Sequence, residues 1–447
     1  MSKLSRLRQR LNEDFIKSIL TVLGGSTVSL ALPIISSLWL LRIYDAASDF
    51  TPFALFASFC ATLSALANSH YTTAILVADN EKESAAMLRL TVIINFIIAV
   101  AGIFLLIFIR EPLLKFLNAS ASFYFTVWLV PVTVLFMGVN AAFTQWAYRF
   151  KRFKTVAVNR MVQAVITVVC QTVFGLYFKN IQGLIIGFVA GQLFASLLLA
   201  FKCLRNDKQL LLSIGIPELR KDAKKYNLFF RFQTPADIIN VFTQQLPSFL
   251  LSKFAVSPAD LGFYGQAYRL MVAPSSIITS AVADVFRQKA NQDYKEKGNA
   301  IEIFVRTAKI LFVIMIFPCL AIAFAGPWIF ETLFGGQWAT AGMYAQILVI
   351  MLLPKFIVSP LTYMYIIARK QVEDFYLHIY ILVSTILAFY LGYKFYGTPE
   401  KMLLFFSINY AFIYVIYFFR SYSFAKRKNG SSINSEDPPT KTILEGI

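Results

Sequence analysis

The sequence predicts an all-α integral membrane protein with twelve transmembrane helices in two parallel six-helix bundles. Of its 447 residues, 57% are hydrophobic and 15% are charged, whereas an average soluble domain is about 45–50% apolar and about 25% charged. The apolar residues form separate runs, each long enough to cross a roughly 30 Å hydrocarbon core as a helix. One long polar stretch, residues 206–227, and a repeated hairpin divide these runs into two sets of six.

Short polar breaks set the bounds of the predicted helices. The first helix follows the basic, amphipathic segment MSKLSRLRQRLNEDF, and because no cleavage site follows a short apolar region, we expect that helix to be retained. The predicted spans are residues 16–41, 50–77, 85–109, 122–147, 156–178, 183–204, 229–252, 261–286, 303–325, 340–367, 375–395 and 401–424.

Two similar hairpins follow the first span of each set. LRIYDAASDFTPF and LSKFAVSPADLGFY both carry a basic residue seven positions before an Asp, and the two aspartates, Asp49 and Asp260, are 211 residues apart. Six helices separate the copies, so the halves have the same orientation and form a parallel repeat about an axis along the membrane normal. The alternative is coincidence, because outward turns often contain Pro, Gly and Asp.

The repeat divides the chain into four predicted parts. They are an N-terminal bundle (1–205), a cytoplasmic linker (206–228), a C-terminal bundle (229–425) and a disordered cytoplasmic tail (426–447).

Positively charged residues are unevenly distributed between the two sides of these spans. With the N-terminus inside, 33 of the 42 lysines and arginines lie in inner segments. Positive charge near helix ends tends to remain in the cytoplasm, so we expect both termini there. The net charge of +18 therefore predicts contact with anionic lipid rather than nucleic acid. The seven outer residues are Arg42, Arg110, Lys115, Lys179, Lys253, Lys394 and Lys401, and Arg269 and Lys355 lie inside spans.

Charged side chains inside the spans are the candidate functional residues, because a charge in hydrocarbon is costly unless it faces a cavity or a partner. Lys355 lies near the midplane of the tenth span, Arg269 lies in the outer half of the eighth, and Arg42 stands at the outer mouth of the first. Such cations suit an anionic ligand, since Lys and Arg bind phosphate through charge-assisted hydrogen bonds. The alternative for each is a structural ion pair or a side chain that reaches the membrane interface.

Asp237 and His70 are the candidates for ion coupling. Asp237 lies in the inner half of the seventh span, and His70, near the inner end of the second, titrates near neutral pH. A hydrogen-bonded packing role is the alternative for the histidine. No cofactor or metal is expected, because the four cysteines lie in or beside apolar runs with no Cys/His grouping.

No catalytic constellation emerges, so we expect a protein that is not an enzyme. The chain has no Gly-rich phosphate loop followed by Lys-Ser/Thr. A membrane glycosyltransferase or polymerase, the enzyme alternative, needs an acidic pair or a sizeable outer loop. Asp45 and Asp49 are the best short pair, and we expect both to be solvated turn residues.

Four segments, in order, resemble the Wzx-type polysaccharide flippases of the multidrug/oligosaccharidyl-lipid/polysaccharide (MOP) exporter superfamily. They are RIYDAASDFTPFALF, HYTTAILVADNEKESAAMLRL, LPSFLLSKFAVSPADLGFYGQAYRLMVAPSSII and AGPWIFETLFGGQWATAGMYAQIL. Two departures stand out. Thr51-Pro52 replaces a Gly of the family pattern, and His70-Tyr71-Thr72 replaces Arg-Tyr-Glu, which puts in doubt a coupling role at Thr72.

The resemblance implies a V-shaped, MATE-like transporter that moves an undecaprenyl-diphosphate-linked oligosaccharide from the inner to the outer leaflet for O-antigen, capsule or exopolysaccharide. It also implies ion-coupled alternating access, with the lipid-linked anion and the bilayer as partners and polymerase machinery as a further one. A multidrug/cation antiporter of the same superfamily is the alternative. A cationic drug favours an acidic cavity, whereas the intramembrane charges here are mostly basic.

Overall fold

The computed structural model describes residue 29 and residues 31–68, 71–119, 121–178, 180–212, 214–226, 234–254, 257–368 and 370–426. Within these ranges every regular element is a helix and there is no strand. The predicted all-α class is therefore confirmed. Three predicted features, the segment 1–28, His70 and the tail beyond Lys426, lie outside the described residues.

The helices form two groups. The first bundle comprises the helix Ala31–Ile43, η1 (Ala46–Phe50), α2 (Thr51–Asn68), α3 (Tyr71–Val77), α4 (Glu81–Phe116), α5 (Ala121–Thr126), α6 (Leu129–Arg149), α7 (Phe153–Phe178), α8 (Ile181–Leu212) and α9 (Ile216–Lys225). The second comprises α10 (Thr234–Phe254), α11 (Asp260–Lys297), α12 (Ile301–Phe334), η3 (Gly336–Trp338), α13 (Ala339–Val358), η4 (Leu361–Tyr363), α14 (Met364–Ile367), α15 (Gln371–Tyr396) and α16 (Pro399–Ala425).

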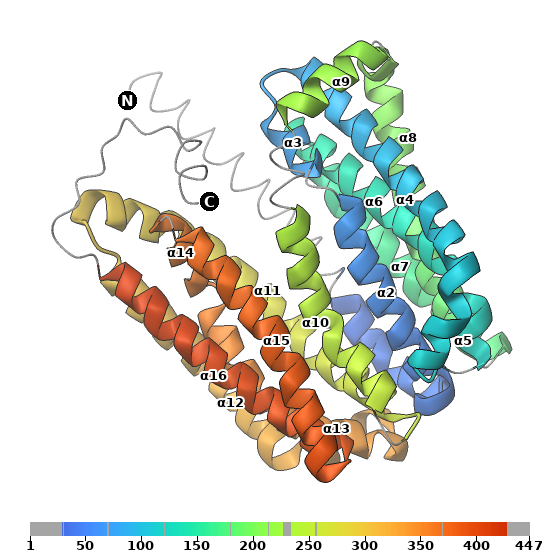
Figure 1. The fold of residues 1–447 in the computed structure, drawn as a ribbon, viewed down its shortest axis with the longest axis vertical. Helices are drawn as coiled ribbons and strands as arrows, with labels where there is room; N and C mark the ends of the chain where they lie inside the picture. The colour runs from blue at the N-terminus through green and yellow to red at the C-terminus, as the bar shows by residue number, and fades with distance from the viewer. Residues whose placement is uncertain are drawn as a thin grey trace.

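Figure 1 shows these bundles as the two arms of a V. They approach each other near α5 and α13 and diverge toward α9 and α14, with α10 between the arms. The predicted V-shaped pair of bundles is confirmed, whereas the domain bounds stay a prediction.

The count of twelve spans is not confirmed. Among the described residues, nine helices are long and apolar enough to cross a membrane, or ten if the bent pair in α11 is one span. The helix Ala31–Ile43 is short, and α10 carries Asp237, Asn240, Gln244 and Gln245, which lower its hydropathy. These two helices fall on the remaining predicted spans, so each predicted span has a helix at its place.

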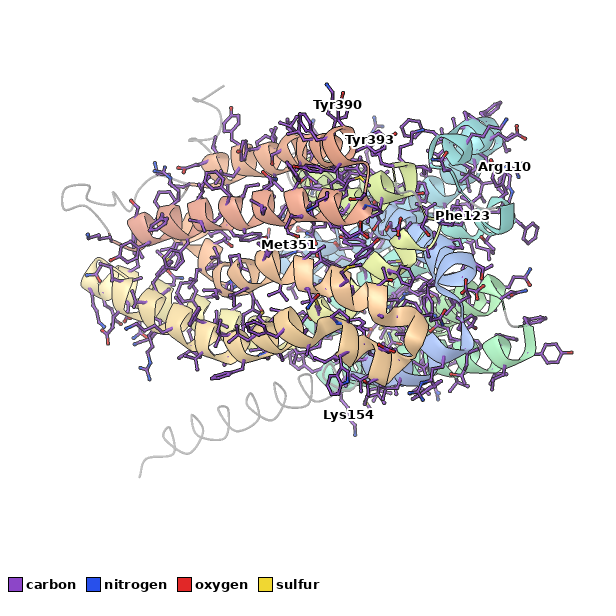
Figure 2. The ribbon with its side chains drawn as sticks, turned by 90° about the horizontal axis from the view of Figure 1, so that it is seen from below. Arg110, Phe123, Lys154, Met351, Tyr390 and Tyr393 are labelled. Carbon is purple, nitrogen blue, oxygen red and sulfur yellow. The ribbon has the colours of Figure 1, made fainter. Side chains whose placement is uncertain are left out.

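The surface of the bundles is that of a multi-pass membrane protein. Large apolar side chains such as Phe108, Phe324 and Phe419 are exposed along the helices. Tyr390 and Tyr393 lie exposed at the periphery of α15 (Figure 2). An aromatic band beside basic residues is typical of the membrane–water interface.

Glycines bring α7 and α8 close together. Gly183, Gly187 and Gly191 recur every four residues and lie on one face of α8. A Cβ on Gly187 would lie 2.5 Å from the Gln171 side chain, which is closer than van der Waals contact allows. Small residues at this spacing let transmembrane helices approach closely, so the polar face of α7 packs directly against α8.

The repeated hairpins meet each other where the bundles touch. Gly262 N donates to Thr51 Oγ1 at 2.9 Å, and Thr51 Oγ1 donates to Pro258 O at 2.6 Å. Thr51 and Gly262 are 211 residues apart, the separation of the repeat, so equivalent positions of the two halves are in contact. Trp338 Nε1 donates to Leu41 O at 2.6 Å in the same region. We call this region the closed end.

The expectation that Asp49 is solvated is wrong. Asp49 and Asp260 are each 5% exposed. Asp49 accepts a hydrogen bond from Asp45 N at 2.9 Å, and Asp260 accepts from Ser257 N at 2.9 Å and from the Tyr344 hydroxyl at 2.8 Å. Each carboxylate therefore ties its own turn together. Asp45 is exposed, as expected.

The polar stretch between the bundles is largely helical. The helix α8 continues to Leu212 with a kink at Asp207, and the amphipathic helix α9 lies across one end of the first bundle (Figure 1). Lys225 of α9 pairs with Asp79 at 2.7 Å and Glu83 at 2.8 Å. We call this region the α9 end.

Candidate functional site: a cavity lined by two arginines

A cavity of about 500 Å³ lies where the first bundle faces α11 of the second. This volume is within the range typical of small-ligand sites, about 300–1,000 Å³. The lining residues are Ser29, Pro33, Phe53, Ala57, Arg160, Gln163, Ala164, Thr167, Gln171, Phe188, Gln192 and Arg269.

A polar stripe on α7 forms one wall of this cavity. Arg160, Gln163, Thr167 and Gln171 are spaced by three or four residues, which places them on one face of the helix. A second stripe on the same helix, also spaced by three or four, is apolar and exposed. Its members are Val158, Met161, Val165, Val169 and Val173. The helix α7 thus turns one face to lipid and the other to α8 and the cavity.

The polar side chains of α7 are held in place by neighbouring helices. Gln171 Nε2 donates to Leu184 O at 3.0 Å, and the Tyr44 hydroxyl donates to Gln171 O at 2.7 Å. Arg160 Nη2 donates to the Tyr148 hydroxyl at 3.1 Å. These contacts hold the wall in a fixed geometry, which favours specific binding over loose solvation.

Among the described residues, Arg269 is the one that lines the cavity from the second bundle. It is half-buried, and it has no hydrogen-bond or ion-pair partner among the residues that the structure describes. An unpaired guanidinium away from bulk water is costly, and an anion in the cavity would offset that cost. Together with Arg160 it places positive charge from both bundles around one space.

Lys355 lies elsewhere in the second bundle. Its Nζ donates to the Tyr268 hydroxyl at 3.0 Å and lies 5.5 Å from the centroid of that ring. Tyr410 and Tyr414 of α16 are further electrostatic neighbours. Lys355 is not among the residues that line the cavity with Arg269, so the structure does not bring the two predicted cations into that space together.

Arg42 lies at the closed end and is exposed. Its Nη2 donates to Leu333 O at 3.1 Å and so links the first bundle to α12. Asp237 lies in the first turn of α10 and is exposed, whereas the sequence placed it well inside a span. The substrate-binding and ion-coupling roles of these residues, and of His70, remain predictions.

Sequence reasoning missed Arg160. It was counted among the inner-loop cations, because it stands close to Arg149, Lys151, Arg152 and Lys154. The polar residues that follow it at helical spacing could have identified it, since a polar stripe on an otherwise apolar span indicates a cavity-facing side.

Two helical bundles with a charged cavity between them are an architecture that membrane transporters use. Solved structures share this fold. An inward-facing multidrug resistance MATE family transporter of the MOP superfamily matches with a TM-score of 0.70 and 14% identity, over 91% of this chain and 100% of that chain. The lipid II flippase MurJ, in an inward closed conformation, matches with a TM-score of 0.71 and 14% identity, over 91% of this chain and 90% of that chain.

The chain belongs to a family of polysaccharide biosynthesis proteins, whose model matches residues 46–342. No curated protein matches the chain in sequence. The family match, together with a fold shared with a MATE transporter of the MOP superfamily and with the lipid II flippase, bears out the resemblance predicted from the motifs.

Proposed function

We propose that the protein is a flippase that moves an undecaprenyl-diphosphate-linked oligosaccharide from the inner to the outer leaflet of a bacterial inner membrane. The observation that carries this proposal is that Arg160 and Arg269, from different bundles, line one cavity. Guanidinium groups bind phosphate oxygens through paired, charge-assisted hydrogen bonds. The diphosphate is the one part of such a substrate that requires this environment.

Contacts from both bundles suit alternating access. With the bundles in contact at the closed end, the anion between Arg160 and Arg269 stabilises the arrangement in which both arginines face it. The oligosaccharide then follows the polar wall of α7, and the polyprenyl tail stays in lipid. An ion gradient drives the cycle, with Asp237 and His70 as the proposed coupling residues and Arg42 as a further contact of the substrate. Contact of Lys355 with the substrate, which the sequence predicts, is the alternative to its role as the partner of Tyr268.

Reconstituted flipping tests the proposal. The full-length protein in liposomes, supplied with a fluorescent polyprenyl-diphosphate oligosaccharide, should transfer it to the opposite leaflet. Arg160→Gln and Arg269→Gln should each abolish most transfer, whereas Lys309→Gln, which removes an exposed cation of α12, should leave it unchanged.

Three results would overturn the proposal. Equal transfer by all three variants would show that the cavity arginines do not bind the substrate. Transport of cationic drugs in place of the lipid would identify an antiporter. Lengthening or transfer of glycan by the purified protein would identify an enzyme.

A further inference from the structure

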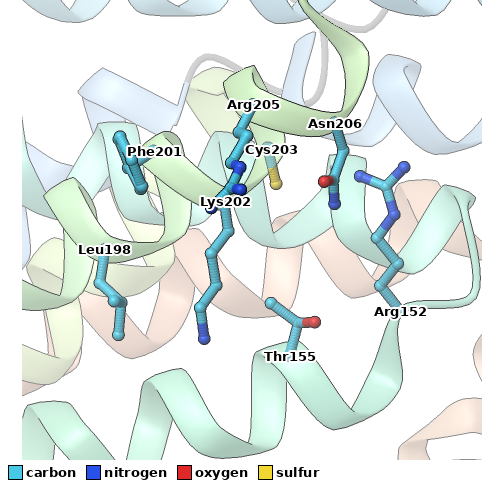
Figure 3. A pocket seen from close by; sticks show the side chains of 8 residues that line it. All are labelled: Arg152, Thr155, Leu198, Phe201, Lys202, Cys203, Arg205 and Asn206. Atoms are coloured by element: carbon cyan, nitrogen blue, oxygen red, sulfur yellow. The ribbon is translucent and has the colours of Figure 1, made fainter.

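A second cavity, of about 460 Å³, lies between the start of α7 and the last turns of α8, away from the two-arginine cavity. Figure 3 shows its side chains, and none of them lines the first cavity. The lining residues are Arg152, Thr155, Leu198, Phe201, Lys202, Cys203, Arg205 and Asn206. We call it the basic pocket.

One of its three cations is already neutralised. Arg152 binds Asp207 with both terminal nitrogens, Nη1 at 2.6 Å and Nη2 at 2.7 Å. Asp207 also accepts from Trp146 Nε1 at 2.8 Å. Because α8 departs from helical geometry at Asp207, this network fixes the kink that forms one side of the pocket.

The other two cations, Lys202 and Arg205, are not neutralised. Neither has a hydrogen-bond or ion-pair partner among the residues that the structure describes. Their spacing of three residues puts both on one face of α8, and in Figure 3 Lys202 extends from α8 toward Thr155 of α7. Thr155 and Asn206 add neutral hydrogen-bond donors beside this charge. The pocket therefore carries two positive charges and the donors that a phosphate group requires.

The pocket is apolar beside these cations and continuous with the lipid-facing surface. Leu198 and Phe201, on the same face of α8 as Lys202, form this apolar part, and Phe201 is 64% exposed. Leu197 and Leu204 of α8 are also exposed. A ligand that has a phosphate at one end and acyl chains at the other would contact the cations and the apolar side chains at once.

We propose that the basic pocket binds the phosphodiester headgroup of an anionic phospholipid, whose acyl chains lie along the exposed apolar side chains of α8. A soluble phosphate would use the cations but make no contact with the apolar side chains beside them, whereas a phospholipid uses both, which favours the lipid as the occupant. Basic pockets between transmembrane helices bind anionic headgroups in this way. This site is independent of the transport cavity.

Native mass spectrometry of the full-length protein tests the assignment. The wild type, titrated with phosphatidylglycerol, should retain one lipid more tightly than it retains phosphatidylcholine. Lys202→Gln/Arg205→Gln should weaken phosphatidylglycerol binding about 25-fold, at about fivefold for each cation removed. The matched control is Lys221→Gln/Lys224→Gln, which removes two exposed cations from α9 at the same end of the molecule and should leave the affinity within about twofold.

A charge-preserving variant and a soluble ligand distinguish a specific lipid site from general surface attraction and from a free-phosphate site. Lys202→Arg/Arg205→Lys preserves both charges and should bind like the wild type, which keeps the test decisive if the glutamine variant fails to fold. Equal losses in the α9 control would show general surface attraction and overturn the proposal, as would undiminished binding by Lys202→Gln/Arg205→Gln. Glycerol 3-phosphate that binds as tightly as the lipid would assign the pocket to a free phosphate instead.

Discussion

Lys355 and Arg269 are both cations inside apolar spans of the second bundle, yet their surroundings differ. Lys355 has a hydroxyl partner and aromatic neighbours within its own bundle. Arg269 has no described partner and faces the first bundle across a cavity. Tyr268, which binds Lys355, is the residue next to Arg269 on α11, so adjacent side chains about 100° apart around the helix serve different spaces. Depth in the membrane predicts what a charge costs, but the helix face determines whether a ligand can use it.

This difference implies that removing the two charges has opposite effects on the stability of the folded protein. Lys355 is compensated by contacts that the folded protein supplies, and its loss leaves the Tyr268 hydroxyl without its partner. None of the described side chains compensates the positive charge of Arg269, so replacing this residue removes the free-energy cost of an unpaired charge. Two measurements test this comparison, and two more test the closed end and α9.

The largest effect is expected for Arg269. Arg269→Gln should lower the flipping rate by about 10- to 100-fold, since one charge-assisted hydrogen bond contributes about 1.5–3 kcal/mol. The melting temperature of the protein should stay unchanged or rise, because an unpaired buried charge is removed. Flipping assays and thermal unfolding of the same preparation measure both. A large fall in melting temperature would show that the guanidinium has a structural partner.

Removing Lys355 should act mainly on stability. Lys355→Met keeps the side-chain length but leaves the Tyr268 hydroxyl unsatisfied, so we expect the free energy of unfolding to fall by about 1–3 kcal/mol. Thermal unfolding in detergent checks this. Tyr268→Phe is the companion variant and should be at least as destabilising, because it leaves the ammonium group unpaired. Abolished flipping with unchanged stability would instead make Lys355 a direct contact of the substrate, as the sequence predicts.

A third position on α11 tests the closed end. A Cβ on Gly262 would lie 2.3 Å from Ala46 O, whereas one on Gly265 would lie 3.2 Å from the Ala54 Cβ. Gly262→Ala should therefore cost about 1–3 kcal/mol through overpacking, and Gly265→Ala should cost less. Cysteine cross-linking across the closed end should also be slower in Gly262→Ala. Equal stability and equal cross-linking rates of the two variants would mean that the bundles can shift apart at the closed end without loss of stability.

The smallest effect concerns a buried charge outside the membrane. Burial in α9, and then repulsion by Glu83, raises the pKa of Asp222 above its ordinary range. The folded protein thus binds this proton more tightly than the unfolded chain, so the destabilisation caused by the charged Asp222 is relieved as pH falls through its folded pKa toward the lower unfolded value. Asp222→Asn should raise stability at neutral pH by about 0.5 kcal/mol and flatten its pH dependence. Melting curves between pH 4 and pH 7 would detect either change, and a loss of stability would point to an unrecognised partner.

Hydrophobic run length predicted where the helices lie, because every run of about 20 apolar residues can satisfy its backbone only as a helix in lipid. It could not predict which residues share a cavity. Arg160 was grouped with its basic neighbours in the sequence, although its side chain lies on the polar face of α7. Asp49 was expected in solvent because turns usually are, but the residue is 5% exposed and its carboxylate interacts with Ile181 at the start of α8. Both errors concern contacts between segments far apart in the chain, which local spacing does not determine.

The contact between Thr51 and Gly262 has a consequence for how the two halves arose. These positions correspond in the repeat and lie against each other, so a symmetric ancestor made of two identical chains would have set this residue against its own copy. A hydroxyl-bearing side chain on both sides would not fit, because even a single added carbon at Gly262 would lie within 3.0 Å of Thr51 Oγ1. Within one chain the two positions can differ, so that one supplies the hydrogen-bonding group and the other the space that receives it. A half-length chain carrying Thr51 should accordingly fail to pair with itself.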